Sequence, residues 1–169
     1  MNSVLADWNC ATSDAALDAM LACCGSRRWA TEMVALRPFE SEHQLMEVAN
    51  AVWSRMSEQD WREAFACHPQ IGERKSANAG SLAASWSRQE QSSIETASAR
   101  ALAAISEGNA LYENQFGFTY IVCATGKSAD EMLAILNRRL RNDRATELLE
   151  AAEQQRQITR IRLGKWASA

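Results

Sequence analysis

A histidine beside a proline is the first feature of this sequence that could do chemistry. Residues 65–76 read FACHPQIGERKS, with His68 directly before Pro69. Proline disfavours the α-helical region for the residue before it, so a helix that runs into this pair must end there. The imidazole would then lie where a helix gives way to a loop, a common place to present a reactive group. The alternative is a structural histidine bonded to the last free carbonyls of the helix.

Cys67 precedes His68, but the two make a poor catalytic pair. Adjacent helical residues point about 100° apart, whereas a nucleophile and its base need to be within hydrogen-bond reach of each other. We therefore expect Cys67 to be a small buried apolar residue. Five cysteines without a Cys-x-x-Cys pair, and two histidines far apart in sequence, predict no disulfide framework and no metal site.

The segment SRQEQ at residues 87–91 is a second candidate. Ser87 and Glu90 have the spacing of a capping box, which predicts the start of a helix here. Capping alone would explain this spacing. In the functional interpretation, Glu90 and Gln91 also face a shared pocket, where the dipole of the helix would favour an anion.

Basic residues crowd the end of the chain, in RQITRIRLGKW at residues 156–166. A solvated basic helix end is the default interpretation, because the helix dipole favours cations there. Arg160 and Arg162 differ by about 200° around a helix axis, so at most one of them would face a given pocket. A guanidinium in that position suits bidentate recognition of a carboxylate or a ureide.

Helical periodicity and capping signals occur along almost the whole chain and predict an all-α fold. With no repeats and no linker, we expect one domain over residues 1–169, a bundle of about eight helices. Capping boxes at Ser41 and Ser128 should open two of these helices, and Gly25 should close another. The longest helical stretch should run from Ser87 to about residue 115, with a break near Ser98 or Gly108.

Two stretches lack helical periodicity. Residues 70–85 are small and polar, and we expect them to form the longest loop, a mobile wall over a site. Residues 116–125, FGFTYIVCAT, are rich in aromatic and β-branched side chains and predict an extended segment. Because a single extended segment cannot form a sheet, we expect a buried connector.

The composition argues against several classes of protein. Apolar residues make up 47% and charged residues 23%, and the net charge of −3 leaves no basic footprint for nucleic acid. The apolar runs fall far short of the ~20 residues that span a bilayer, so we expect no membrane association. The first residues carry no secretory signal pattern, and the cysteine usage fits a reducing compartment, so we expect a cytoplasmic protein.

Taken in order, these segments resemble the 2-oxo-4-hydroxy-4-carboxy-5-ureidoimidazoline (OHCU) decarboxylases of urate degradation. The most specific part of the resemblance is HPQIG at 68–72, followed by SRQEQ at 87–91 and FGF at 116–118. Further similar segments run along nearly the whole chain: CCGSRRW at 23–29, RPF at 37–39, NALYENQFGF at 109–118 and ITRIRL at 158–163.

The resemblance implies an all-helical, often dimeric lyase that needs no cofactor and converts OHCU into (S)-allantoin and carbon dioxide. It implies His68 and Glu90 as catalytic residues, and we expect Glu90 to hydrogen-bond His68 and fix its tautomer. The substrate-binding residues that it implies are Pro69, Ser87, Gln91, Arg162 (with Arg160 as the alternative) and the backbone from Phe118 to Ile121.

Two other functions remain open from the sequence. A hydrolase of a related cyclic ureide would use the same histidine and glutamate to activate water. A helical interaction module could keep the fold without the activity. Polar residues of the kind found at His68, Glu90 and Gln91 favour an enzyme, because a scaffold has no need of a polar cluster in its interior.

Overall fold

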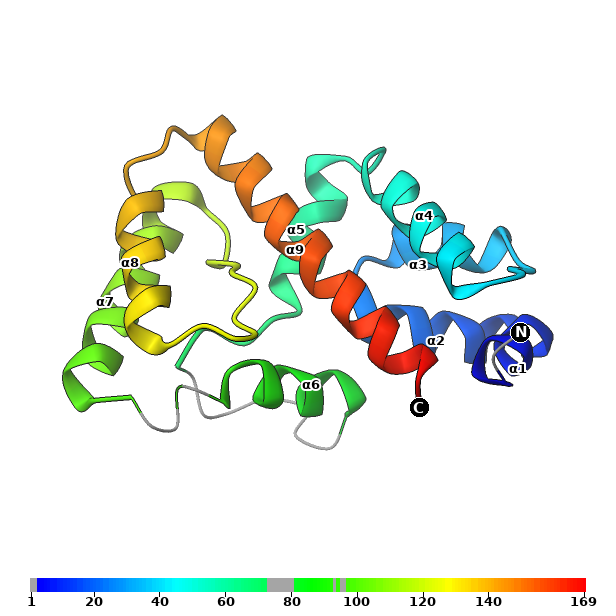
Figure 1. Ribbon diagram of the computed structural model, residues 1–169. Helices are drawn as coiled ribbons and strands as arrows, with labels where there is room; N and C mark the ends of the chain where they lie inside the picture. Colours follow the sequence, from blue (N-terminus) through cyan, green and yellow to red (C-terminus); the bar gives the residue numbers. More distant parts are fainter. Residues whose placement is uncertain (1–2, 73–80, 93, 95–96) are drawn as a thin grey trace. The chain divides into compact units, whose positions relative to one another are not determined.

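The computed structural model describes residues 3–72, 81–92, 94 and 97–169. These residues form nine α-helices and no strand, which confirms the predicted all-α class (Figure 1). The helix that the sequence did not predict is α1 (Ser3–Cys10), a short element that buries Leu5 and Trp8. None of the helices in these ranges combines the length and the apolar character that crossing a bilayer requires.

The chain folds into two compact units, and the divisions between them fall within α5 (Glu58–Ala66) and α9 (Arg144–Ala167). The first unit comprises residues 1–64 and 155–169, and the second comprises residues 65–154.

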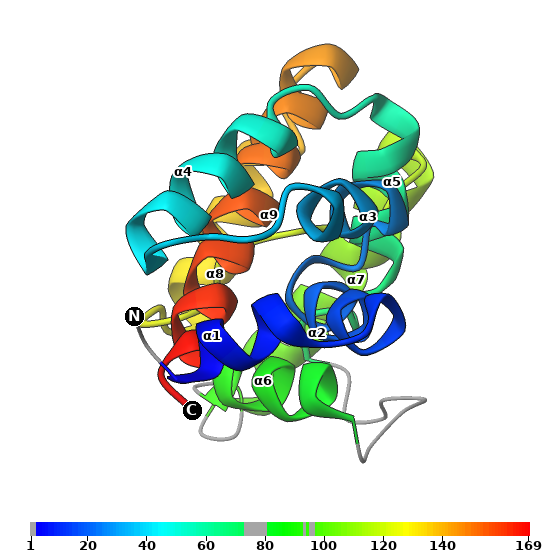
Figure 2. The same ribbon diagram turned by 90° about the vertical axis from the view of Figure 1, so that its right-hand side faces the viewer.

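The first unit contains α1 and three further complete helices: α2 (Ser13–Cys24), α3 (Arg27–Ala35) and α4 (Glu42–Trp53). α3 packs against both α2 and α4 (Figure 2). Gly25 ends α2 in the left-handed conformation, as predicted. Ser41 caps α4 by accepting a hydrogen bond from the Gln44 amide, although the Gln44 side chain accepts from the amide of Glu40 and not from that of Ser41.

Tryptophans form much of the core of the first unit. Trp8 stacks on Phe39 with ring centroids 5.8 Å apart and meets the edge of Trp166 at 5.7 Å. Trp29 is fully buried, and its indole N–H donates to the Ala49 carbonyl at 3.1 Å. Buried indole N–H groups usually have a hydrogen-bond partner. These contacts show that Trp8 and Trp29 are core residues.

The second unit contains α6 (Leu82–Glu90), α7 (Ala99–Phe116) and α8 (Ala129–Arg139). α7 and α8 lie side by side (Figure 1). Gly108 of α7 faces Leu136 of α8. A Cβ atom at Gly108 would lie 2.5 Å from Leu136 Cδ2, so the absence of a side chain allows this close approach. α8 opens with the predicted capping box of Ser128 and Glu131.

Between α7 and α8, residues 118–124 form the predicted buried connector without helix or strand structure (Figure 1). Arg139, which is fully buried, donates to the Ile121 carbonyl at 2.6 Å and to Glu147 Oε1 at 2.7 Å. Burial alone would lower the pKa of Arg139, but the hydrogen bond to Glu147 and nearby groups raise it above its ordinary value. The connector is therefore attached to a guanidinium that remains charged.

The structure corrects the predicted start of the helix at Ser87. α6 begins at Leu82 and is capped by Ser81, whose hydroxyl accepts from the Ala84 amide at 3.2 Å. Ser81 and Ser87 are both suitable N-caps, but the earlier start lets the helix bury Ala84 and Trp86. The long helix predicted over 87–115 is likewise two helices, and the break near Ser98, which caps α7, is confirmed.

This correction also shortens the predicted loop and changes the electrostatic argument. The loop predicted over residues 70–85 ends where α6 begins, and its central part, 73–80, lies outside the described residues. Glu90 and Gln91 lie at the C-terminal end of α6, where the helix dipole is negative. The dipole of α6 therefore does not favour an anion beside Glu90.

Candidate active site

His68 lies just past the end of α5, as the sequence predicted. α5 ends at Ala66, and the backbone N–H of His68 donates to the Phe65 carbonyl at 3.1 Å. The residue as a whole is half-buried, and its Nε2 atom is buried. Cys67, which we expected to be buried, is exposed. The chain just past α5 therefore has the Nε2 atom of the imidazole buried and the neighbouring Cys67 exposed.

A hydrogen bond joins the HPQIG segment (residues 68–72) to the SRQEQ segment. The backbone N–H of Gly72 donates to Gln91 Oε1 at 3.2 Å. Gly72 has a φ of 87°, a left-handed conformation that other residues adopt only with strain. Because its Oε1 accepts this bond, the Gln91 amide nitrogen is left to donate elsewhere.

Ser87 and Glu90 lie three residues apart on α6 and therefore share one face of this helix. Ser87 is buried, with 7% of its surface exposed, and Glu90 is half-buried. Glu90 is close enough to Cys123 for its charge to act on the thiol. Burial is the main reason that the pKa of Cys123 is raised; Lys127 lowers it and Glu90 adds to the increase. Glu90 thus lies near the connector.

Phe118 and Ile121 lie in this connector, and both are buried. The ring of Phe118 packs against Phe65, three residues before His68, with centroids 5.5 Å apart. Phe118 therefore has a packing role through its side chain. The Ile121 carbonyl accepts a hydrogen bond from Arg139. This bond fixes the backbone on which the predicted substrate contact depends.

The second unit therefore brings together three segments that were singled out in the sequence. HPQIG contacts SRQEQ through Gly72 and Gln91, Glu90 acts on Cys123 of the connector, and the connector packs on the last turn of α5 through Phe118.

Arg162 belongs to the first unit, where it is almost fully buried with 4% of its surface exposed. Its charge acts on Cys23 of α2: burial raises the pKa of this thiol to about 12, and Arg162 partly opposes that increase. A buried guanidinium is expensive to desolvate unless its charge is compensated. This placement differs from the solvated helix end that was the default interpretation of the basic segment.

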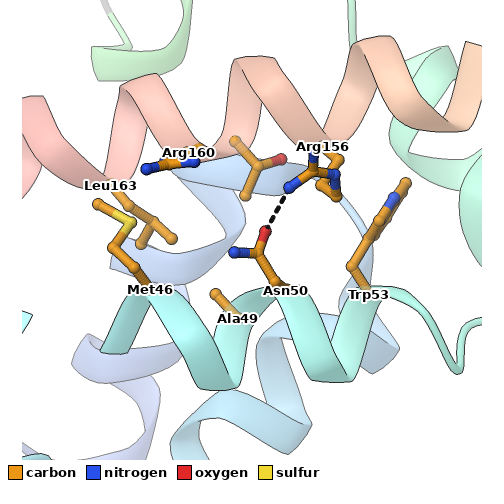
Figure 3. A pocket seen from close by; sticks show the side chains of 8 residues that line it. Met46, Ala49, Asn50, Trp53, Arg156, Arg160 and Leu163 are labelled. Carbon is orange, nitrogen blue, oxygen red and sulfur yellow. Dashed lines mark hydrogen bonds between the residues drawn. The ribbon is translucent and has the colours of Figure 1, made fainter. Parts of the chain in front are cut away.

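Arg160 lies on another face of α9, as the angle between the two positions predicts. It is exposed and lines a small pocket between α4 and α9 (Figure 3). Met46 and Asn50 of α4 line the same pocket, and Asn50 Oδ1 accepts a hydrogen bond from Arg156 at 3.0 Å. Arg160 and Arg162 thus have different surroundings within one unit.

Three residues that support these segments were not identified from the sequence. Asn109 and Glu113 of α7 bind the HPQIG segment, and Arg139 of α8 binds the connector. The spacing of Asn109 and Glu113, one helical turn apart, was the available signal. No sequence pattern distinguished Arg139 from its basic neighbours Arg138 and Arg141.

The protein is all-helical, and its second unit contains His68 and Glu90, two half-buried residues whose side chains are able to transfer protons. Within the described ranges, no group of three or more histidine, cysteine, aspartate or glutamate residues could hold a metal ion. Residues 9–164 match the family model of OHCU decarboxylase. The chain therefore belongs to the OHCU decarboxylase family, which consists of carboxy-lyases of urate degradation.

Individual relatives are similar over most of this chain. It is 39% identical over 144 residues to the uric acid degradation bifunctional protein TTL of Arabidopsis thaliana; the match covers 85% of this chain and 44% of that protein. It is 28% identical over 127 residues to the OHCU decarboxylase of Amia calva, covering 75% of this chain and 73% of that one. The chain thus spans less than half of the length of the plant protein.

Solved structures show the same fold. An OHCU decarboxylase crystallised in the presence of (S)-allantoin superposes with a TM-score of 0.77 at 33% sequence identity, covering 90% of this chain and 99% of that chain. An (S)-allantoin synthase superposes with a TM-score of 0.71 at 18% identity, covering 96% of this chain and 53% of that chain; it shows the fold alone.

Proposed function

We propose that this protein catalyses the decarboxylation of OHCU to (S)-allantoin and carbon dioxide, and that residues 1–169 act as one OHCU decarboxylase domain. The observation that carries the proposal is the contact of HPQIG with SRQEQ, in a chain that matches the family over residues 9–164. These are two of the three segments in which the family resemblance is most specific, and residues 73–86 separate them in sequence.

In the proposed reaction, the bond between the ring carbon and the carboxylate breaks and carbon dioxide leaves. The electron pair passes into the conjugated ring of the substrate, which acts as its own electron acceptor. A proton added to one face of the ring then sets the configuration of the product. The protein has to orient the substrate, stabilise its charge and deliver this proton.

The roles of the residues follow from their chemistry. His68 acts on the hydroxyl or carboxylate group of the substrate, and Glu90 hydrogen-bonds the imidazole and fixes its tautomer. Ser87 and Gln91 bind heteroatoms of the ring, with Gln91 donating through its amide nitrogen because its oxygen is bound to Gly72. Pro69 and the backbone from Phe118 to Ile121 contact the ring of the substrate.

Arg162 anchors the carboxylate or the ureido group of the substrate in this proposal. Its burial supports this role, because a guanidinium taken out of water interacts strongly with an anion. Arg160 is the weaker candidate, because it is exposed beside Asn50 and Met46. We further propose a homodimer, as the family resemblance implies, and a cytoplasmic location, which the cysteine usage favours.

Product analysis tests the proposal. Freshly generated OHCU is added to the protein, and carbon dioxide release is followed together with the ring structure of the product. Release faster than the uncatalysed decay, with the ring retained, supports a lyase. Ring opening without accelerated release would establish a hydrolase of cyclic ureides, and the uncatalysed rate alone would leave a helical interaction module.

A further inference from the structure

α7 holds the HPQIG segment through two side chains. Gln70 Nε2 donates to Glu113 Oε1 at 2.8 Å, and Asn109 Nδ2 donates to the Ile71 carbonyl at 2.9 Å. Asn109 and Glu113 are one helical turn apart, so they lie on the same face of α7. We call these two residues the α7 clamp.

The clamp completes a set of three consecutive attachments. Gln70 and Ile71 are bound by α7, and Gly72 is bound by Gln91 of the SRQEQ segment. On the other side of the segment, the backbone N–H of His68 is bound at the end of α5. The chain on both sides of the imidazole is therefore fixed, which limits the directions in which the imidazole can point.

The asparagine at position 109 makes a buried hydrogen bond and also carries an energetic cost. The residue is 2% exposed, and among the described residues its Oδ1 atom is buried without a hydrogen-bond partner. A buried polar atom left in this state costs about 1–3 kcal/mol. A leucine of similar size would avoid this cost but would leave the Ile71 carbonyl without this donor. What asparagine adds is an N–H donor for the Ile71 carbonyl.

We propose that Asn109 and Glu113 are positioning residues that hold the His68 imidazole in its reactive orientation. The expected effect of the α7 clamp on turnover rests on the proposed function of His68. Its expected effect on the orientation of the imidazole does not. Displacement of a reacting group by about 1 Å can cost 10²-fold in rate, so attachments at Gln70 and Ile71, two and three residues after His68, are sufficient to affect turnover.

An NMR measurement tests the positioning without reference to activity. The chain has two histidines, and His43, whose side chain is 81% exposed, serves as an internal control. Asn109→Leu should shift or broaden the imidazole carbon–proton signals of His68 and leave those of His43 unchanged. Asn114→Leu, at an exposed position of the same helix, should change neither. Unchanged His68 signals in folded Asn109→Leu would overturn the proposal.

Kinetics then test the consequence for turnover. Asn109→Leu should lower kcat about 10- to 100-fold with a smaller effect on KM. The double variant Asn109→Leu/His68→Asn should be no slower than His68→Asn alone, because a residue that acts through the imidazole has nothing further to lose. Multiplied losses in the double variant would show that Asn109 acts independently of His68.

Glu113 provides a second variant should Asn109→Leu fail to fold. Glu113→Ala should lower kcat, and Glu113→Gln, which keeps the acceptor oxygen for Gln70, should recover most of the loss. Glu107→Ala, at an exposed position of α7, is the matched control. If the wild-type protein does not accelerate the loss of OHCU, the proposed function fails, while the NMR result still decides whether the clamp positions His68.

Discussion

At the residue scale, His68 combines the features that an acid–base residue needs. It follows the end of α5, its Nε2 atom is buried, and the segment after it is held by side chains from two helices. A histidine that only capped a helix end would not need such attachments beyond it. The arrangement favours the chemical role of His68 over the structural one.

His68→Asn and Glu90→Gln should each lower kcat by roughly 10²–10⁴, the usual contribution of a positioned acid–base group. Both substitutions retain the approximate shape of the side chain, so folding should be intact. Steady-state kinetics with fresh OHCU, together with circular dichroism in the far ultraviolet, would check both statements. Turnover close to wild type in both variants would remove these residues from the mechanism.

Arg162→Lys should lower kcat/KM by about 10- to 100-fold, because lysine retains the charge but loses the bidentate geometry of the guanidinium. Arg160→Lys is the matched control and should stay near wild type, since Arg160 is exposed beside α4. Thermal unfolding of both variants separates a loss of binding from a loss of packing. A larger loss of kcat/KM in Arg160→Lys than in Arg162→Lys would show that Arg160, and not Arg162, anchors the substrate.

At the element scale, the close contact of α7 with α8 depends on Gly108. Alanine there would gain about 1 kcal/mol in helix propensity, but its Cβ atom would meet the buried side chain of Leu136 at 2.5 Å. Overpacking of this kind costs about 1–3 kcal/mol. Gly108→Ala should therefore lower the free energy of unfolding, measured by urea denaturation.

Gly164→Ala in α9 is the matched control for this prediction. Its Cβ atom would lie 3.8 Å from Met46 Cε, which is an ordinary contact. No overpacking then offsets the gain in helix propensity. Gly164→Ala should therefore raise the free energy of unfolding by up to about 1 kcal/mol. Equal effects of the two substitutions would show that α7 and α8 can separate without cost.

Several helix boundaries could be predicted from caps, because a cap is a local interaction. Gly25, Ser41 and Ser128 mark helix ends in the structure as the sequence predicted. The start of α6 could not be predicted in this way, because Ser81 and Ser87 are equivalent as caps. Burial of Trp86 favours the earlier one, and burial is a property of the folded chain.

The site could be predicted only in part for the same reason. The sequence identified HPQIG and SRQEQ as chemically interesting, but their contact through Gly72 and Gln91 depends on how helices pack. Spacing along the chain does not determine this. The spacing of Asn109 and Glu113 places them on one helix face, but it does not predict that Asn109 meets the Ile71 carbonyl, which depends on the folded chain.

At the scale of the whole molecule, buried thiol and phenol groups make stability depend on pH. Burial raises the pKa of Cys23 from 9.0 to about 12 and also raises those of Tyr112 and Tyr120. Above its ordinary pKa, each group ionises more readily in the unfolded chain, so the unfolded state binds fewer protons than the folded one. The contribution of these groups to stability is therefore fully present below pH 9 and is lost as the pH rises.

Cys23→Ala should reduce this dependence between pH 9.0 and about 12. One titrating group contributes at most about 1.4 kcal/mol per pH unit to the slope. Urea denaturation across this range would measure the slope for the wild type and the variant. Cys67→Ala, which changes an exposed thiol, should leave the slope unchanged. Identical slopes for wild type and Cys23→Ala would contradict the raised pKa of the Cys23 thiol.

The configuration of the product tests the central claim most directly, because OHCU also decays without an enzyme and disappearance of substrate proves little. Circular dichroism of the allantoin formed from freshly generated OHCU should report an excess of the S enantiomer with the wild-type protein. With His68→Asn the product should approach a racemate. A racemic product from the wild-type protein would contradict the claim that this chain directs the proton to one face of the ring.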